Sequence, residues 1–499
     1  MRDICMYRAG KLWSSCGHAT LLISLMINLA SAQKPSYDLS FSTYHGGRGE
    51  GSRDVATDGA GNIYVTGGVF SGLPTAASAY DKTANGNSDV FISKFDAAGN
   101  LVWSTYLGGP NYDRAYAIEV DAQGYVYVAG RAGEKFPTTP GVVQPNFGGH
   151  INKSTHYGAQ DAFVAKLSPD GSQLIWSTYF GSDGGEIARD MDIDKEGNVY
   201  LGIGKCRRNH PHITPKAFKI RREAEDAVVA KLSNDASTVL YCTYLGGSRF
   251  DGETPSIRVD NAGHLYVLMG TSSTDAPTTP GAFDTSYNGG NKDMLVSKLS
   301  LDGSSLVFST FLGGSGYEGS ETHGLALDIS GNVYVYFLTD SPNLPVTANA
   351  FQSSYVAGRG RYPWDVYVSK LSPDGSKVLA ATYLGGFGED IAEGIDVDSV
   401  GHVYLSGSTK SADFPVSSNA FDKSLDGEKD GFFAKFNPDF SKLLYSTYIG
   451  GSKVDSLRSI DLVPSGAVAA SGGSGSRDFP MLNSHQTSPG HQILIQFTP

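Results

Sequence analysis

A seven-residue string, WSTYLGG at 103–109, constrains this chain most, because close copies of it recur along the sequence. The other copies are FSTYHGG at 41–47, WSTYFGS at 176–182, YCTYLGG at 241–247, FSTFLGG at 308–314, AATYLGG at 380–386 and YSTYIGG at 445–451. Their closing GG (or GS) pairs begin at 46, 108, 181, 246, 313, 385 and 450, so the period is 62 to 73 residues. A fixed internal period is typical of solenoids, propellers and arrays. We therefore expect seven mutually dependent units and not a string of separate domains.

Four short blocks follow one another in each repeat. An alternating apolar run such as RAYAIEVD at 114–121 leads into a D-x-x-G turn and a VYV run, as in DAQGYVYVAG at 121–130. A Pro-containing loop, FPTTPGVVQ at 136–144, and the run DAFVAKL at 161–167 precede the next STY string. The runs are short, rich in Val, Ile, Tyr and Phe, and bounded by Gly, Asp, Asn or Pro, which is typical of antiparallel strands.

These blocks predict an all-β protein, a seven-bladed β-propeller with four-stranded blades. One twisted sheet cannot cover both of its faces, and radial stacking gives every blade two neighbours. A parallel β-helix is the competing repeat fold, but it usually has a shorter period and lacks such hairpin turns. The mature chain opens with a fourth strand, YDLSFSTYHGG at 37–47, and ends with a third strand, HQILIQFTP at 491–499. The N- and C-terminal strands are therefore expected to close the ring by sharing one blade.

The combination of a D-x-x-G-N-[VI]-Y-[VL] turn and strand, an FPT loop, D-x-F-[VI]-x-K-[FL] and STYLGG resembles the SBBP (bacterial beta-propeller repeat) family. The resemblance covers residues 37–497 and implies the propeller fold and an exported location, while the family carries no agreed activity. The seventh repeat departs most from the pattern: Val463 and Ala469 replace the turn Asp and the Tyr, and His491 and Gln496 replace the strand Asp and Lys. Less regular packing is expected there.

Residues 1–32 are predicted to be a signal peptide. A basic start precedes the apolar run TLLISLMINLA at 20–30, and a small-x-small cleavage site follows at 30–32. The apolar run is shorter than the roughly 20 residues that cross a membrane. We therefore expect residues 33–499 to be a single propeller domain without a transmembrane span, exported to the periplasm, the cell surface or the medium.

The charge and the cysteines exclude some classes of partner and of fold. The formal net charge of the chain is −12, and removal of residues 1–32 makes it −14. An acidic protein lacks the basic footprint that nucleic acid and anionic membranes require. The mature chain keeps two cysteines, Cys206 and Cys242, which is not a disulfide framework. A strand between them predicts a separation of about 9–10 Å, beyond disulfide reach unless a loop folds over.

An acid follows the first Gly of every repeated pair by four or five residues. The seven acids are Glu50, Asp113, Glu186, Asp251, Glu318, Asp390 and Asp455. In a propeller they are expected near the mouth of the central channel, where a ring of carboxylates could hold Ca²⁺ through oxygen ligands. The alternative is that each acid accepts backbone N–H groups of its own Gly-rich loop, which the mixture of Asp and Glu favours. No cofactor is expected, with Ca²⁺ as the open exception.

Irregular loops between the second and third strands are the candidate ligand-binding site. Strand alternation places them on the same face as the GG loops, and the loops of the second and third blades are expected side by side because these blades are neighbours. The second blade inserts 148–160, the third carries a basic segment at 205–222, and the fifth carries 356–364. The candidate residues are Arg207, Arg208, His210, His212, Arg221, Arg222, His150, His156, Arg361 and Trp364. Such groups suit an anion such as a phosphate, a uronate or a sulfated sugar. Alternatively, their charges meet the acids of adjoining blades.

The chain contains no G-x-S-x-G elbow, H-E-x-x-H helix, phosphate loop or nucleotide fingerprint. We therefore predict a binding or interaction scaffold that recognises an extracellular polysaccharide or protein. The alternative is a carbohydrate-active hydrolase or lyase that gathers carboxylates from several blades at the channel mouth. A purely structural envelope component is the third hypothesis.

Overall fold

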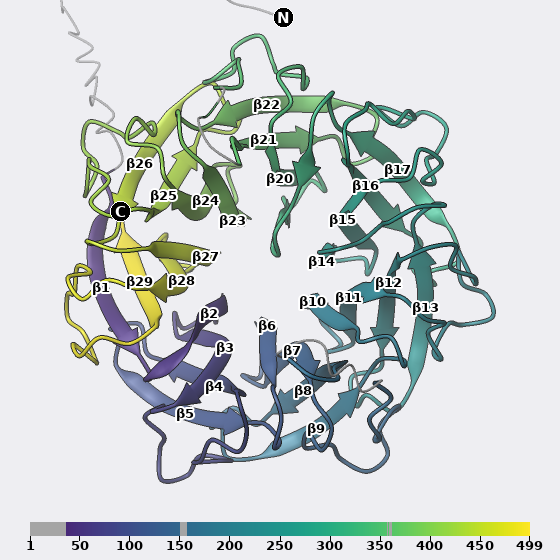
Figure 1. The fold of residues 1–499 in the computed structure, drawn as a ribbon, viewed down its shortest axis with the longest axis vertical. Coiled ribbons are helices and arrows are strands. Elements are labelled where there is room, and N and C mark those ends of the chain that lie inside the picture. Colours follow the sequence, from purple (N-terminus) through teal and green to yellow (C-terminus); the bar gives the residue numbers. More distant parts are fainter. Residues whose placement is uncertain (1–35, 150–156, 357, 359–361) are drawn as a thin grey trace, which may run out of the picture. The chain divides into compact units, whose positions relative to one another are not determined.

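Seven antiparallel sheets stand radially around a central channel (Figure 1). The structure is a computed structural model that describes residues 36–149, 157–356, 358 and 362–499, and these residues form strands and turns without helices. This arrangement confirms the predicted seven-bladed β-propeller of four-stranded blades. The predicted signal peptide at 1–32 lies outside the described residues.

The strands of each blade run from the channel outward in chain order. Blades 1 and 2 contain β2 (Arg48–Thr57), β3 (Ile63–Ser71), β4 (Asp89–Phe95), β5 (Leu101–Leu107), β6 (Arg114–Val120), β7 (Val126–Ala132), β8 (Asp161–Leu167) and β9 (Leu174–Tyr179). Blades 3 and 4 contain β10 (Ile187–Ile193), β11 (Val199–Cys206), β12 (Asp226–Leu232), β13 (Val239–Leu245), β14 (Ser256–Val259), β15 (Leu265–Thr271), β16 (Asp293–Leu299) and β17 (Leu306–Leu312). Blades 5 and 6 contain β18 (Glu318–Gly319), β19 (Leu325–Leu327), β20 (Val333–Thr339), β21 (Asp365–Leu371), β22 (Val378–Leu384), β23 (Asp390–Val397), β24 (Val403–Thr409), β25 (Asp430–Phe436) and β26 (Leu443–Ile449).

Blade 7 closes the ring with strands from both ends of the chain. It contains β27 (Asp455–Leu462), β28 (Val468–Ser474), β29 (Gln492–Thr498) and β1 (Asp38–His45), in that order. β1 pairs antiparallel with β29, so that Asp38 lies opposite Thr498 and His45 opposite Gln492. The predicted sharing of one blade by the termini is confirmed. The sheet has the same strand order as the other blades, although its sequence departs most from the repeat.

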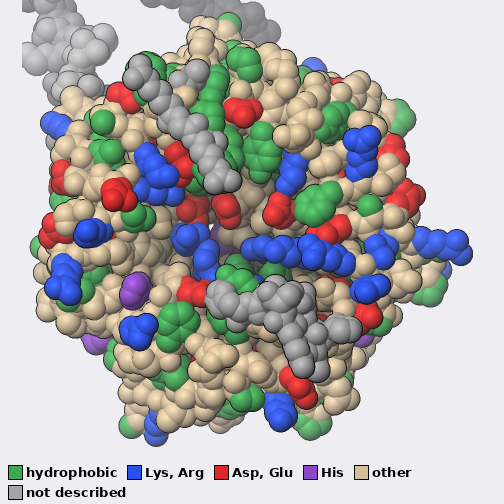
Figure 2. All heavy atoms as spheres, in the orientation of Figure 1, with side chains coloured by type: hydrophobic (Ala, Val, Ile, Leu, Met, Phe, Trp, Pro, Cys, Tyr) green, Lys and Arg blue, Asp and Glu red, His purple; other side chains and the backbone are tan. Residues whose placement is uncertain are grey.

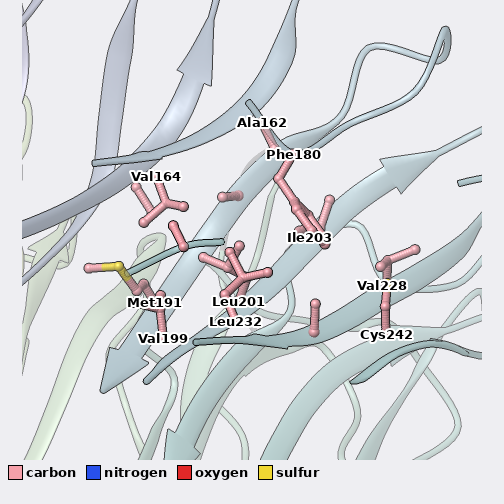
Figure 3. Close-up of a cluster of buried hydrophobic side chains, with 14 of the residues drawn as sticks. Ala162, Val164, Phe180, Met191, Val199, Leu201, Ile203, Val228, Leu232 and Cys242 are labelled. Carbon is pink, nitrogen blue, oxygen red and sulfur yellow. The ribbon is translucent and has the colours of Figure 1, made fainter. Parts of the chain in front are cut away.

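The core consists of apolar layers between neighbouring blades. Between blades 2 and 3, side chains such as Val164, Met191, Leu201 and Ile203 are fully or almost fully buried against one another (Figure 3). Each face of a blade contributes alternate residues of its strands, as the period of two requires. Burial of this apolar surface is the main stabilising contribution, and it makes each blade depend on its neighbours.

The STY string fastens the Pro-containing loop to the outer strand. In blade 1 the Asp81 amide donates to Thr105 Oγ1 at 2.9 Å, and the Leu73 amide donates to the Tyr106 hydroxyl at 2.9 Å. Thr310 binds Asp284 in the same way in blade 4. The two ends of the loop are thus held by consecutive residues, which explains why Thr and Tyr recur together.

The first Gly of the GG pair lies between two buried carboxyl groups, which leave no room for a side chain. A Cβ on Gly385 would lie 2.6 Å from Cγ of Asp365 and 2.9 Å from Oδ2 of Asp390, which is closer than real Cβ contacts. Both acids are fully buried. The first Gly is therefore required because only a residue without a side chain fits between the acid that opens the third strand and the acid that follows the GG pair.

The turn Asp and the strand Lys also build the blade. Asp194 accepts from the amides of Glu196 and Asn198, and Lys231 Nζ lies 2.9 Å from its carboxylate. Equivalent ion pairs join Lys298 to Asp260 and Lys370 to Asp328. These residues recur in most repeats because they fix the hairpin.

Candidate functional site

The GG loops and the loops between second and third strands lie on one face of the ring, as predicted. The Asn87 amide, in the blade 1 loop, donates to the Asn111 carbonyl of the next GG loop at 2.8 Å. The Asp113 amide returns a bond to the Ser88 carbonyl at 2.7 Å. We call this side of the molecule the loop face.

The basic segment of blade 3 is largely committed to local contacts. Arg207 Nε lies 2.6 Å from Glu225, and Arg222 bonds the Ala224 carbonyl. Arg208 and Arg221 are exposed. Among the described residues, fewer cations of this segment are therefore available to a ligand than its composition suggests.

The two histidines of this segment pack at the junction with blade 2. His210 is buried, and burial lowers its pKa to about 3. The ring of His212 stacks on Phe180 with centroids 4.7 Å apart, and its Nε2 lies 3.0 Å from Oε1 of Gln144 in the blade 2 loop. The loops of blades 2 and 3 therefore lie side by side, as predicted. They enclose a shallow cavity of about 410 Å³ lined by Gln144, Gly148, Gly181, Ser182, Asp183, Asn209, Pro211 and His212.

The other predicted ligand residues separate into two groups. His150, His156 and Arg361 lie outside the described residues. Trp364 stacks on Tyr317 at 5.5 Å and lies against Tyr362 at 4.7 Å, so it forms an aromatic cluster beside the GG loop of blade 5.

Six of the seven acids beyond the GG pairs are fully buried. Each accepts from the amide of the second residue of its own pair, as Asp251 does from Gly247 at 2.6 Å and Asp390 does from Gly386 at 2.8 Å. The others with this bond are Asp113, Glu186, Glu318 and Asp455. Glu50 instead pairs with Arg114.

Among the described residues no three or more metal-binding side chains lie close enough to hold an ion. Cys206 and Cys242 are both free and buried.

Three residues beyond each of these acids, the innermost segment of each blade contributes one residue to a ring around the channel, and five of the seven lie in strands. Around the axis from blade 1 to blade 7 the ring residues are Arg53, Tyr116, Arg189, Thr254, Glu321, Glu393 and Arg458. Figure 2 shows Lys and Arg side chains, together with acidic ones, bordering the hollow at the centre of the ring. Sequence reasoning missed this ring because it looked for the site among the irregular loops and the acids after the GG pairs. Reading three residues beyond each acid would have found it.

Four guanidinium groups surround one tyrosine at the channel mouth. The Cζ atoms of Arg114 and Arg189 lie 5.0 and 5.1 Å from the centroid of the Tyr116 ring. Those of Arg53 and Arg131 both lie 5.7 Å from it. We call these four arginines the guanidinium cluster. They come from β2, β6, β7 and β10, so blades 1, 2 and 3 must all be assembled to form it.

The guanidinium cluster is only partly neutralised. Glu50 pairs with Arg114, whereas Arg53, Arg131 and Arg189 form no ion pair with any residue that the structure describes. Glu253 and Glu321 lie farther away, where the charge of Arg189 acts on both of their carboxyl groups. Arg131 lies over the Tyr157 ring at 3.8 Å. Each of the four arginine side chains has at least one buried nitrogen atom without a hydrogen-bond partner.

The ionisable neighbours respond to this positive charge. Burial alone would raise the pKa of Tyr116, but the guanidiniums of Arg114, Arg131 and Arg189 lower it below its usual value. Burial and the charges of Arg189 and Arg131 lower the pKa of Lys205, which is the penultimate residue of β11 in blade 3. A site with these properties favours a bound anion.

The opposite side of the channel mouth is acidic. Glu253 pairs with Lys292 at 2.6 Å, and Glu393 pairs with Arg458 at 2.6 Å. The Glu321 side chain is exposed within the channel, where desolvation by the surrounding protein atoms and the nearby Glu393 raise its pKa, against the opposing charges of Arg458 and Arg189. The mouth therefore has a basic side on blades 1 to 3 and an acidic side on blades 4 to 6.

An insertion in blade 5 crosses the channel beneath the mouth. The interval from the post-GG acid to the turn Asp is eight residues in blades 1, 2, 3 and 6 but ten in blade 5, where 320–324 interrupts the inner strand. His323 Nε2 lies 3.1 Å from the Tyr116 carbonyl oxygen, and Nδ1 lies 3.3 Å from Oδ1 of Asp190. These partners belong to blades 2 and 3, on the far side of the ring. The mouth is therefore a pocket with a floor.

The fold and this mouth define a seven-bladed β-propeller with a charged, loop-rimmed central pocket. Within the chain, residues 102–137 match the family model SBBP, described as Beta-propeller repeat. No helix that could cross a membrane occurs in the described part of the chain.

Other similarities are more distant. The chain is 25% identical over 278 residues to "Regulatory protein FlaEY" of Caulobacter vibrioides, covering 52% of this chain and 27% of that protein. This chain thus spans about a quarter of that relative's length. Quinohemoprotein alcohol dehydrogenase from Comamonas testosteroni superposes with a TM-score of 0.44 at 12% identity, covering 93% of this chain and 76% of the other. BamB from Moraxella catarrhalis gives 0.38 at 9% identity, covering 93% and 100%. Similarity at this level says nothing about the activity of this chain.

Proposed function

We propose that this protein is an exported β-propeller that binds an acidic polysaccharide outside the cell through its loop face. The observation that carries the proposal is the guanidinium cluster, which gathers four cations with unsatisfied nitrogen atoms at the channel mouth of a protein with a net charge of −12. Arginine in such a site binds carboxylate or sulfate through parallel hydrogen bonds.

The aromatic cluster on the same face supports a sugar ligand. Trp364 lies between Tyr317 and Tyr362, and Tyr362 is 42% exposed. Aromatic rings with an apolar face and a polar edge suit ligands that are both flat and hydroxylated. Polar side chains around the cavity between blades 2 and 3 add hydrogen-bonding groups to the same surface.

Binding assays with labelled polysaccharides test the proposal. We expect residues 33–499 to bind a polyuronate or sulfated glycan and to bind a neutral dextran far more weakly, with affinity that falls as salt rises. Charge reversal of the exposed Arg208 and Arg221 should slow association and weaken binding. Equal binding to neutral and acidic glycans would contradict the proposal. Capture of an acidic protein, with no glycan bound, would identify the other class of partner.

Export is a separate part of the proposal. Residues 1–32 support it because they have the charge pattern and cleavage site of a signal peptide. Fractionation of cells that express the full chain or residues 33–499 should show the protein outside the cytoplasm only when residues 1–32 are present.

A carbohydrate-active hydrolase or lyase is the second candidate function. Glu321 and Glu393 favour it, because both face the channel mouth and the raised pKa of Glu321 suits a general acid. The buried acids Glu186, Asp251 and Glu318 are less suited, since they hold the GG loops. Product formation from an acidic glycan, abolished in Glu321→Gln with binding retained, would establish this activity.

A further inference from the structure

We infer that the guanidinium cluster is a site for one carboxylate or sulfate group at the end of an acidic glycan chain, so that the propeller recognises chain ends. The inference rests on the proposed function and specifies where the ligand's anionic group is held. Four observations lead to it: buried cations with unsatisfied nitrogen atoms, their clustering around one tyrosine, a closed floor and an acidic opposite wall.

The buried cations are the first step. Arg114 is 3% exposed and Arg131 is 6% exposed. Nε and one terminal nitrogen of Arg114, and Nε of Arg131, have no hydrogen-bond partner. A buried charged group without its partners costs folding free energy. Such groups are retained where a ligand supplies the missing acceptors, and an oxyanion supplies several at once.

The convergence of the cations is the second step. All four guanidinium groups lie at similar distances, 5.0 to 5.7 Å, from the centroid of the Tyr116 ring. They reach it from three different blades. Glu50 occupies only Arg114 and the Tyr112 hydroxyl among these groups. Lys205 adds a further cation nearby, at a backbone φ of 65° that a lysine rarely adopts. Guanidinium groups gathered around one side chain supply several hydrogen-bond donors, and one carboxylate or sulfate has several lone pairs to accept from them.

The closed floor is the third step. His323 bonds the carbonyl of Tyr116 itself and reaches Asp190 from across the ring. Below this level the channel is acidic: burial and the neighbouring Asp192 raise the pKa of Glu119, and burial and Asp396 raise that of Asp461 to about 8. A polyanion therefore cannot thread through the channel, and the site admits only a group that ends there.

The opposite wall is the fourth step. Glu321 of blade 5 is exposed at the mouth, where the charges of Glu393 and Glu253 act on it together with those of Arg458 and Arg189. Carboxylates there repel a second anionic group held deep in the pocket. The rest of an acidic chain must then leave over the basic side, where Arg208 and Arg221 are exposed on blade 3. One terminal anion enters, and the following sugars lie over the loop face.

Titration calorimetry with defined oligouronates tests the inference. The ligands are glucuronate, a tetrauronate and a long polyuronate, with sulfate as a competitor. If chain ends are recognised, affinity per mole of chain ends stays nearly constant as the chain lengthens. Arg53→Gln and Arg189→Gln are the informative variants, because both side chains are partly exposed and neither has an ion-pair partner in the described chain. Each should weaken binding roughly 10- to 100-fold, the loss expected for a charged hydrogen bond.

Arg477→Gln is the matched control, since Arg477 is exposed in the loop after the second strand of blade 7 and belongs neither to the guanidinium cluster nor to the predicted ligand residues. It should bind as the unaltered protein does. Oligouronate binding that survives in Arg53→Gln and Arg189→Gln would overturn the inference while leaving the proposed function intact. Affinity that rises in proportion to chain length would overturn the recognition of ends. If sulfate binds at the cluster and no uronate or sulfated glycan does, the proposed function fails, and the assignment of the site to a glycan fails with it.

Discussion

His323 shows how one residue can decide whether a propeller channel is open. Its φ of 61° lies in the left-handed region that side chains other than Gly rarely adopt. That conformation turns the ring from blade 5 toward Asp54 of blade 1 and Asp190 of blade 3. Burial alone would lower its pKa, but Asp54 and Asp190 raise it, against a smaller opposing effect of Arg258.

The stabilising contribution of His323 should therefore depend on pH. A histidine whose folded pKa exceeds its unfolded pKa of 6.5 contributes stability that is complete below pH 6.5 and is lost as the pH rises through the folded pKa. We expect His323→Gln to cost about 1–3 kcal/mol of unfolding free energy at pH 6, and less at pH 9. Urea unfolding across this range measures the difference, with the exposed His491→Gln as the control. A cost that does not change with pH would show that the imidazole is held neutral.

At the scale of the element, the GG loop couples each blade to the next. Its first Gly separates two buried carboxylates, and its second donates an amide to one of them, as Gly386 does to Asp390. The same carboxylate of Asp390 accepts from Ser411 at 2.8 Å, at the end of the second strand. The inner strand, the second strand and the preceding blade thus meet at one acid.

Gly385→Ala tests this account of the GG pair. The added Cβ would lie within 3 Å of both Asp365 and Asp390, so the carboxylates must shift apart. We expect a loss of about 1–3 kcal/mol of unfolding free energy, as for overpacked cores. Gly59→Ala is the control, because a Cβ there meets nothing within 4 Å. Chemical denaturation compares the two, and equal stability of both variants would contradict a steric role for the first Gly.

At the scale of the whole molecule, buried carboxylates recur around the ring, and burial raises their pKa. It raises the pKa of Asp113 and Glu318 to about 7, and that of Asp161 and Asp365 to about 8. The folded state therefore holds protons that the unfolded chain has already released. Stability should then fall as the pH rises from 6.5 to 8.5, because ionisation in the folded state is opposed by burial.

Calorimetric melting of residues 33–499 measures this dependence. We expect the melting temperature to decrease steadily over that range, and the decrease should be smaller in Asp365→Asn, which removes one of the titrating acids. A melting temperature that rises with pH would mean that the carboxylates are stabilised as anions.

Ring closure is the other property of the whole molecule. β1 completes blade 7 beside β29, and Tyr44, Ile493 and Phe497 are buried in the same cluster. Deletion of residues 36–46 should expose this cluster and an unpaired strand edge, leading to aggregation or to the loss of most of the cooperative unfolding transition. A circular permutant that joins residue 499 to residue 36 and opens the exposed turn at 58–61 should remain folded, since Asp38 and Thr498 are already paired. Light scattering and calorimetry distinguish the two, and a stable, monomeric deletion variant would contradict the role of closure.

The sequence alone determined the blades and their closure, because strand periodicity, turn residues and the recurrence of STYLGG are local properties that repeat. It also placed the irregular loops of blades 2 and 3 side by side, as His212 and Gln144 confirm. Only the tertiary structure decided the candidate site. Arg53, Arg114, Arg131 and Arg189 come from four strands, and they meet because radial packing brings the inner edges of blades 1, 2 and 3 to one axis. The closure of the channel by the His323 segment is equally non-local, since the residues that His323 contacts lie across the ring. Local patterns specify which residues form strands, whereas charge balance at an axis depends on where those strands finally lie.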